Sequence, residues 1–328
     1  MGEGAGGAAG GATGLRVGTY NLYLGADLLL LLGDRTPAEI AANREEVRRQ
    51  LEATAFPGRV DAVARLLVDQ RLDLVGLQEV CRWEVDGALL WDFAELLTGA
   101  LAGLGEPYDV VVADPTFSGS GTLELDGAPV RLGLTGSNAV LRRRGARVEV
   151  VSTSTGRFRE ALRLTAMGET ELAIGRGWCA ARCRVAGGGE LVFATTHTEA
   201  HDEGSRDVQR DELVALLPGD GTPTVLVGDF NAPPDRVGMP AGLVDAWVAA
   251  GHGTEDPAGV TSGQAADLRN EESWLHQRID YVWVRGLAVE ECHRFGAEPE
   301  DRTGTGLWPS DHAGVAATVV MPTRQARK

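Results

Sequence analysis

The 328-residue sequence contains almost no lysine: among its 31 basic residues, Lys328 alone is a lysine and the rest are arginines. This absence excludes enzymes that need a buried amine for a Schiff base, and nucleotide-binding proteins that use a phosphate-loop lysine. Long apolar runs are also absent, because the longest leucine run, residues 28–32, is far shorter than the ~20 apolar residues that span a bilayer. The sequence therefore predicts a chain without a transmembrane helix.

Cysteines are few and scattered. Only Cys179 and Cys183 lie near each other, and they have no companion cysteine or histidine pair of the kind that forms a zinc knuckle. We expect reduced thiols with a structural role. The glycine-rich start, residues 1–14, lacks the basic and apolar regions of a signal peptide, which favours a disordered tail on a cytoplasmic protein.

Negative charge is in excess, since 47 acidic residues give a net charge of -16. This balance argues against a protein that binds nucleic-acid backbone over its whole surface. Residues 131–184 have an excess of positive charge instead, with eleven arginines and four glutamates. Three of these arginines, Arg142, Arg143 and Arg144, are consecutive, and consecutive strand residues point to opposite faces. A solvated strand face is therefore favoured over a phosphate-binding rim.

Apolar strand patterns and helical patterns alternate along the whole chain, which is typical of an α/β layered fold. Strands are expected at residues 15–22, 73–80, 108–113, 138–141, 191–196, 224–227, 279–284 and 315–320. Helices are expected at 37–55 and 205–217, and a third has an apolar face over residues 60–67. No linker divides the sequence. We expect one domain over residues 15–321, a C-terminal tail at 322–328, and a long loop at 252–277.

Polar side chains recur where the apolar strands end or begin: Asn21, Glu79, His197, Asp229, Asn231, Asp280, Asp311 and His312. In α/β sheets the loops at strand ends bind ligands, so these residues are candidates for one site. Carboxylates, amides and imidazoles without thiolates suit Mg2+ or Mn2+ rather than structural zinc. A cation would also relieve the repulsion among several buried carboxylates.

Six short motifs follow one another in a characteristic order: TYN at 19–21, LQEV at 77–80, TTH at 195–197, GDFN at 228–231, RIDYV at 278–282 and SDH at 310–312. In this order, and over nearly the whole chain, they resemble the endonuclease/exonuclease/phosphatase (deoxyribonuclease-like) superfamily. The resemblance implies a four-layer α/β sandwich, in which two mixed β-sheets pack face to face between helices. It also implies divalent-metal-dependent hydrolysis of a phosphoester by an activated water.

The resemblance implies a metal site and a catalytic group at defined positions. The metal ligands would be Asn21, Glu79 and Asp311, around Mg2+ or, as the alternative ion, Mn2+. The catalytic residues would be His197, Asp229, Asn231, Asp280 and His312. Asp229 would orient or deprotonate the water, and Asn231 would hold the scissile phosphate. The two histidines would bond the phosphoryl oxygens, with Asp280 fixing His312 in its tautomer and favouring its charged form. The sequence leaves open whether Asp229 or His312 is the base.

Three further residues are candidates for substrate binding, and each has a structural alternative. Asn138 would contact phosphate or cap a strand end. His201 would lie behind His197 or on the surface. Gln264 would shape the substrate pocket or hold its own loop through side-chain hydrogen bonds.

The favoured function is a phosphodiesterase or phosphatase acting on a small-molecule or lipid-like substrate. Nucleic acid is the disfavoured partner, because the chain is acidic and shows no evident platform of aromatic and basic residues for a strand. The alternatives are a nuclease and the same scaffold recruited to a non-phosphate biosynthetic reaction, in which the metal acts as a Lewis acid. Retention of every motif residue argues against a binding module without activity.

Overall fold

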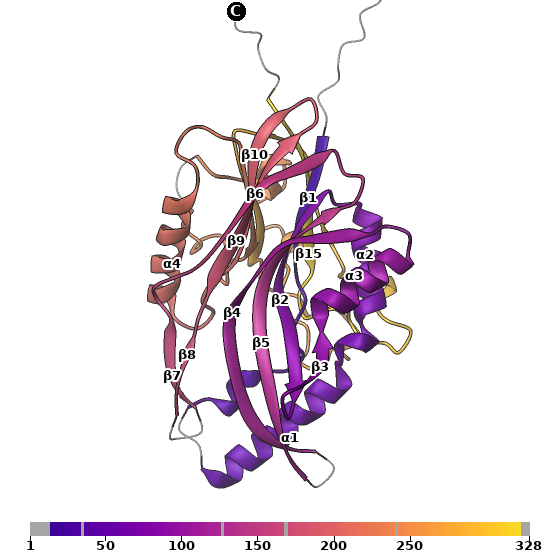
Figure 1. Ribbon diagram of the computed structural model, residues 1–328, viewed down its shortest axis with the longest axis vertical. Helices are drawn as coiled ribbons and strands as arrows, with labels where there is room; N and C mark the ends of the chain where they lie inside the picture. Colours follow the sequence, from indigo (N-terminus) through magenta and orange to yellow (C-terminus); the bar gives the residue numbers. More distant parts are fainter. Residues whose placement is uncertain (1–13, 34–35, 126–127, 167–169, 240–241, 323–328) are drawn as a thin grey trace, which may run out of the picture.

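Two mixed β-sheets form the centre of the molecule, with helices outside them (Figure 1). This computed structural model describes residues 14–33, 36–125, 128–166, 170–239 and 242–322. The expected sandwich of two mixed sheets flanked by helices is confirmed. The tails expected at residues 1–14 and 322–328 fall almost entirely outside the described residues.

The first sheet has the strand order β14-β15-β1-β2-β5-β4, with β3 also paired to β2. Its strands are β1 (Gly14–Asn21), β2 (Leu74–Val85), β3 (Ala88–Asp92), β4 (Tyr108–Leu125), β5 (Ala128–Arg143), β14 (Ala288–Phe295) and β15 (Gly314–Val320). Strand β1 is parallel to β2 and antiparallel to β15. The first and last strands of the described chain are therefore neighbours.

The second sheet has the order β12-β13-β11-β10-β9-β6. Its strands are β6 (Val148–Arg157), β9 (Gly177–Val185), β10 (Gly189–His197), β11 (Thr224–Asp229), β12 (Val244–Asp245) and β13 (Asp280–Arg285). A separate hairpin is formed by β7 (Leu162–Ala166) and β8 (Thr170–Ile174). Strands β10 and β11 are parallel, so their carboxyl ends meet at one edge of the sheet.

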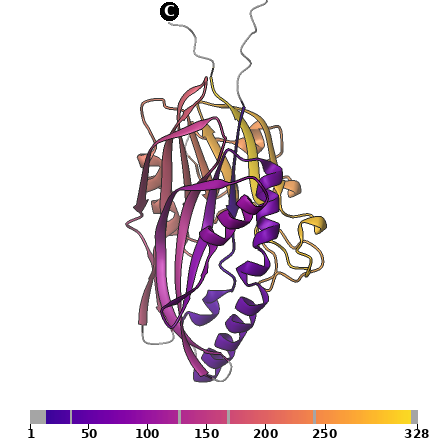
Figure 2. The same cartoon turned by 45° about the vertical axis from the view of Figure 1, so that its right-hand side comes forward.

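Helices α1 to α3 cover the outer face of the first sheet, and α4 lies outside the second, as the two views show (Figures 1 and 2). The helices are α1 (Pro37–Ala53), α2 (Val60–Gln70), α3 (Phe93–Gly103), α4 (Glu203–Leu216) and α5 (Ala246–Ala249), with 3-10 turns η1 (Leu28–Leu31), η2 (Phe56–Gly58), η3 (Pro257–Gly259) and η4 (Pro299–Asp301). Helix α1 begins with a capping box between Thr36 and Glu39, which satisfies backbone N–H groups at its start. No helix in the described ranges is both long and apolar enough to cross a membrane.

A chain of buried polar side chains crosses the apolar core between the sheets. The Thr19 hydroxyl donates to Gln78 Oε1 at 3.1 Å, and Gln78 Nε2 donates to Thr195 Oγ1 at 2.8 Å. Each donor has a partner, so the chain is buried without leaving unsatisfied groups. It fixes β1 and β2 against β10 immediately before the strand ends that carry Asn21 and His197.

The three consecutive arginines, Arg142, Arg143 and Arg144, are paired with carboxylates on different sides of their strand. Arg142 and Arg144 both pair with Asp109, at 2.9 and 2.7 Å, whereas Arg143 pairs with Asp73 at 2.6 Å. Two of the three consecutive arginines thus share one partner, and the middle one has another. The four cysteines are buried and free, as expected.

The largest departure from the predicted elements is the long hairpin of β4 and β5. Only residues 108–113 and 138–141 read as strands in the sequence, but the hairpin extends over β4 and β5 in full. The β4 part of the extension contains polar and glycine residues, TFSGSG at 116–121, and is half-exposed or exposed, so it lacks the apolar alternation of a buried strand.

Candidate active site

The candidate site lies where the strands of both sheets end side by side. In the β10–β11 register His197 is opposite Asp229, and in the β11–β13 register Asp229 is opposite Asp280. Asn21 ends β1 of the other sheet, and His312 precedes β15. The sheet packing therefore brings together side chains from the two ends of the sequence.

Two non-glycine residues at the site have a left-handed backbone conformation, which residues other than glycine rarely adopt. Glu79 has φ +53° at a register irregularity between residues 77 and 80, and Asn231 has φ +48°. Left-handed backbone at non-glycine residues is uncommon, and bulges re-aim side chains beside active sites. Gly228, with φ +148°, passes so close to Thr196 that a Cβ atom would clash with its carbonyl oxygen. Glycine is required there.

The first group of side chains surrounds Asn21. Its Nδ2 donates to Glu79 Oε1 at 3.3 Å and to Asp229 Oδ2 at 3.1 Å. The Ser310 hydroxyl donates to the Asn21 carbonyl oxygen at 2.7 Å, which holds the following residue, Asp311, beside this group. Burial raises the pKa of Asp311 to about 6; His312 opposes this rise and the Glu79 charge adds to it.

The second group is a row of acids and imidazoles that runs across the site. Asp280 Oδ2 lies 2.8 Å from Nδ1 of His312, and Nε2 of the same ring lies 3.7 Å from Asp229 Oδ2. Asp229 Oδ2 is in turn 3.4 Å from Nε2 of His197. One ligand atom from each of Asp229, Asp280 and His312 lies within 4.8 Å of the others, so these three could also hold a cation.

The two histidines have opposite protonation tendencies. Burial lowers the pKa of His197 well below its ordinary value, and the nearby charges of Arg176 and His312 lower it further. Burial opposes the charged form of His312 as well, but Asp280, Asp311 and Asp229 together raise its pKa well above its ordinary value. At neutral pH the site therefore contains one neutral imidazole and one imidazolium.

The donor chemistry of the site fits a hard divalent cation. Burial and the Asp280 charge raise the pKa of Asp229 to about 7, although His312 opposes this shift, and the pKa of Asp311 is also raised. These carboxylates lack enough positive charge around them. Asp280 Oδ1 is buried and has no hydrogen-bond partner among the described residues. Carboxylate and amide oxygens are the ligands that Mg2+ and Mn2+ prefer.

Arg176 is a functional candidate that the motifs do not mark. Its guanidinium Nη1 lies 3.3 Å from each ring nitrogen of His197, and its Nε lies 3.4 Å from the fully buried Glu199 carboxylate. It immediately precedes Gly177, which is opposite His197 in the β9–β10 ladder. The glycine triplet at 187–189 is a hairpin signal from which this register, and hence Arg176, could have been predicted.

Arg59 holds the two loops that flank the metal-ligand candidates. This fully buried guanidinium donates to the carbonyl oxygens of Leu22 and Tyr23, at 3.0 Å each, and of Pro309 at 2.5 Å. The first two carbonyls follow Asn21, and the third lies two residues before Asp311. No sequence pattern indicates this role, because Arg59 stands in an ordinary position at the start of α2.

Comparison with known families places the chain in one of them. Residues 18–312 match the endonuclease/exonuclease/phosphatase family. The chain belongs to this family. Its members are generally metal-dependent phosphoester hydrolases. A comparison with curated protein sequences found no match.

Solved structures of the endonuclease/exonuclease/phosphatase fold resemble the chain over nearly its whole length. Truncated TDP2 from Caenorhabditis elegans is 18% identical, with a TM-score of 0.55, over 94% of this chain and 97% of that one. An endonuclease/exonuclease/phosphatase from Bacteroides vulgatus is also 18% identical, with a TM-score of 0.56, over 94% and 100%. TDP2 from D. rerio, complexed with a single-stranded DNA product, is 16% identical, with a TM-score of 0.57, over 94% and 99%. At these identities the likeness shows the fold.

The other predicted residues occupy distinct positions in this family member. Asn231 is half-buried, and its Nδ2 donates to the Thr198 carbonyl oxygen at 2.9 Å. Asn138 is buried, and its Nδ2 donates to the Gly177 carbonyl oxygen at 2.8 Å.

Of the remaining two candidates, one is buried in its loop and the other is on the surface. Gln264 Oε1 accepts from Asn270 Nδ2 and from the Trp274 backbone, and its Nε2 donates to Ser273. The side chain of His201 is exposed. The amides of Asn138 and Gln264 are thus engaged within the protein, and substrate binding by these two residues and by His201 stays a prediction.

Proposed function

We propose that this protein is a divalent-metal-dependent phosphodiesterase that cleaves its substrate by in-line attack of an activated water. The observation that carries this proposal is the continuous row from Asp280 through His312 and Asp229 to His197, with Asn21 and Glu79 beside it. The row combines a base, a fixed positive charge and a carboxylate group suited to a cation within one buried site. Such a combination serves phosphoryl transfer.

Asn21, Glu79 and Asp311 are the residues that would hold the metal: Asn21 Nδ2 lies 3.3 Å from Glu79 Oε1, and the Glu79 charge helps to raise the pKa of Asp311. A bound divalent cation supplies positive charge beside the phosphoryl oxygens. Arg59 supports this group by tying together the loops that carry Asn21 and Asp311.

Asp229 is the proposed base for the attacking water. Its pKa of about 7 places it near operating pH, where a base is most effective. His312 is the weaker candidate because its raised pKa keeps it protonated and unable to accept a proton at neutral pH. The protonation tendencies therefore favour Asp229 over His312, an alternative that the sequence leaves open. The water proton passes to Asp229 Oδ2 as the new P–O bond forms. The leaving oxygen departs with the electron pair of the opposite P–O bond and takes a proton from solvent.

The histidines and Asn231 are proposed to hold the phosphoryl group. The His312 imidazolium, kept charged by Asp280, donates to a phosphoryl oxygen whose negative charge grows in the transition state. Neutral His197 donates through one ring nitrogen, and the adjacent guanidinium of Arg176 adds positive charge at the same place. Asn231, whose backbone N–H donates to Asp229 Oδ1 at 2.9 Å, is proposed to hold the scissile phosphate beside the base.

The test is hydrolysis of bis-p-nitrophenyl phosphate with Mg2+ and with Mn2+. We expect Glu79→Ala and His312→Ala to lower kcat by at least about a thousandfold while circular dichroism shows an unchanged fold. The matched control is His293→Ala, because His293 lies on β14, outside the site, and is bonded to Gln70. Full activity in His312→Ala, or an equal loss in His293→Ala, contradicts the proposal.

A nucleic-acid substrate is the second candidate, and the D. rerio TDP2 complex with single-stranded DNA favours it. The -16 net charge favours a small or lipid-like phosphodiester instead. Four further substrates, assayed under the same conditions, separate these candidates. They are a phosphomonoester, sphingomyelin, single-stranded DNA and double-stranded DNA. A chain that binds metal but turns over none of them would instead support recruitment of the scaffold to a non-phosphate reaction.

A further inference from the structure

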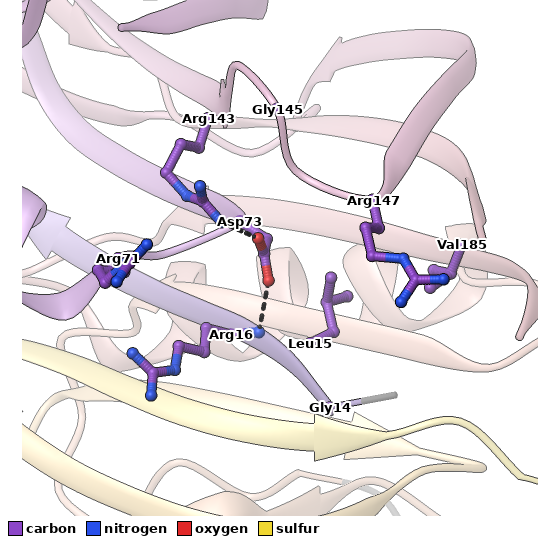
Figure 3. Close-up of a pocket in the computed structure, with 9 residues that line it drawn as sticks. All are labelled: Gly14, Leu15, Arg16, Arg71, Asp73, Arg143, Gly145, Arg147 and Val185. Carbon is purple, nitrogen blue, oxygen red and sulfur yellow. Dashed lines mark hydrogen bonds and ion pairs between the residues drawn. The ribbon is translucent and has the colours of Figure 1, made fainter. Parts of the chain in front are cut away.

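A hollow of about 420 Å³ lies at the end of the sheets opposite the candidate active site. Figure 3 shows the residues that line it. It opens where β1 begins at Gly14 and where β5 ends at Arg143. Asn21 is at the far end of β1, which at about 3.3 Å per residue places the catalytic end roughly 23 Å away. The hollow is therefore a separate feature of the molecule.

Four arginines line this hollow, Arg16, Arg71, Arg143 and Arg147, with one carboxylate, that of Asp73. In Figure 3 Asp73 lies in the middle with Arg143 beside it, and Arg147 lies on the other side of Leu15 from Arg16 and Arg71. Arg16 and Arg71 thus lie on one side of the opening and Arg147 on the other. Such a concentration of positive charge stands out in a chain of net charge -16.

The single carboxylate is already engaged. Asp73 Oδ1 accepts from Arg143 Nη2 at 2.6 Å, and Oδ2 accepts from the Arg16 backbone N–H at 3.0 Å. The side chains of Arg16, Arg71 and Arg147 are exposed and have no hydrogen bond or ion pair to any described residue. Three guanidinium groups at this opening therefore keep their donors available for a ligand.

The backbone around the arginines is fixed by hydrogen bonds between strands. The Asp73 N–H donates to the Arg16 carbonyl oxygen at 2.7 Å, and the Arg143 N–H donates to the Asp73 carbonyl oxygen at 3.1 Å. The Ala186 N–H donates to the Arg147 carbonyl oxygen at 2.9 Å, and Arg71 ends α2 with φ +50°. A ligand would not have to order these segments, which lowers the cost of binding.

We propose that this hollow binds a small diphosphate anion, either inorganic pyrophosphate or the diphosphate group of a nucleotide. Guanidinium groups bind phosphoryl oxygens through paired, charge-assisted hydrogen bonds, and arginines on different sides suit two linked phosphoryl groups better than one. The volume is that of a site for a small molecule. Leu15 and Val185 provide the apolar part of the lining.

The test is isothermal titration of the full chain with pyrophosphate, inorganic phosphate and ADP in EDTA, at about 0.15 M salt to screen diffuse attraction. We expect pyrophosphate to bind at least tenfold more tightly than phosphate. Tighter binding of ADP than of pyrophosphate identifies a nucleotide as the ligand, and equal or weaker binding of ADP identifies the inorganic anion. The absence of pyrophosphate binding up to about 1 mM, a Kd that corresponds to little more than about 4 kcal/mol, overturns the proposal.

The variants locate the binding. The double substitution Arg16→Ser with Arg147→Ser should weaken pyrophosphate binding at least tenfold and leave turnover of bis-p-nitrophenyl phosphate within twofold. The matched control replaces two other exposed arginines, Arg159 and Arg236, by serine and should leave binding within twofold. An equal loss in the control would show a response to net charge, and unchanged binding in the Arg16/Arg147 variant would place the anion elsewhere. Displacement of pyrophosphate by a short single-stranded DNA alone, without ADP competition, would indicate a nucleic-acid surface. Each of these three results overturns the proposal.

Discussion

The two ends of the sheets treat charge in opposite ways. At the catalytic end most charged groups are buried and paired, as with the Asp280–His312 pair and with Arg59 among backbone carbonyls. At the other end the arginines are mostly exposed, and the lining of the hollow has four arginines but one carboxylate, that of Asp73. Burial makes a charge expensive to leave unmatched, whereas exposure leaves it available for binding. The catalytic end is thus organised before a ligand arrives, and the arginine end offers donors to one.

Asp280→Asn tests the comparison with the largest expected effect, because it removes a buried partner. We expect kcat to fall by about a thousandfold, since His312 loses the carboxylate that fixes its tautomer and keeps it charged. The pKa of His312 falls when this negative charge is lost, so the imidazolium deprotonates at lower pH. A profile of kcat against pH should therefore show its alkaline limb shifted toward acid. An unchanged alkaline limb would show that Asp280 does not keep His312 charged.

Arg59→Met should have the next largest effect, which we expect in the free energy of unfolding rather than in kcat. The substitution leaves three carbonyl oxygens at the site and that of Thr54 buried without their donor. We expect the free energy of unfolding in urea to fall by about 3 kcal/mol. The matched change at the other end, Arg147→Met, should alter it by less than about 0.5 kcal/mol, because that side chain is exposed. Equal effects would remove the distinction between the two ends.

Arg176→Gln should have the smallest effect of the three. It removes one positive charge beside His197, for which we expect kcat/KM to fall by about tenfold to a hundredfold. Arg176→Lys should recover part of the loss, because lysine keeps the charge without the planar guanidinium. Arg71→Gln, at the arginine end, should leave turnover within twofold. Full activity in Arg176→Gln would show that Arg176 only pairs with Glu199.

The sequence predicts that short motifs at strand ends lie close together, and the structure has them so, while the chemical roles of their residues stay predictions. Asp229 and Asp280 stand next to apolar strands whose pairing follows from their pattern, and the structure places them opposite each other. Prediction from the sequence failed where placement depends on a partner distant in the sequence. Arg59 acts through carbonyl oxygens, which any residue supplies, so no side-chain pattern marks it. Arg176 is marked by no motif, and only the glycine triplet at 187–189 indicates the β9–β10 register that places it beside His197.

The pairing of the first strand with the last sets when the site can exist during synthesis. Strand β1 needs β15 as its neighbour, and the Asn21 carbonyl oxygen receives its bond from Ser310 across a separation of 289 residues. Until the segment from His312 through β15 has emerged from the ribosome, a nascent chain lacks that histidine or the strand that follows it. Such a chain cannot hydrolyse anything by this route, however much of its sandwich has already formed. The candidate site is therefore complete only after β15 has left the ribosome and paired with β1.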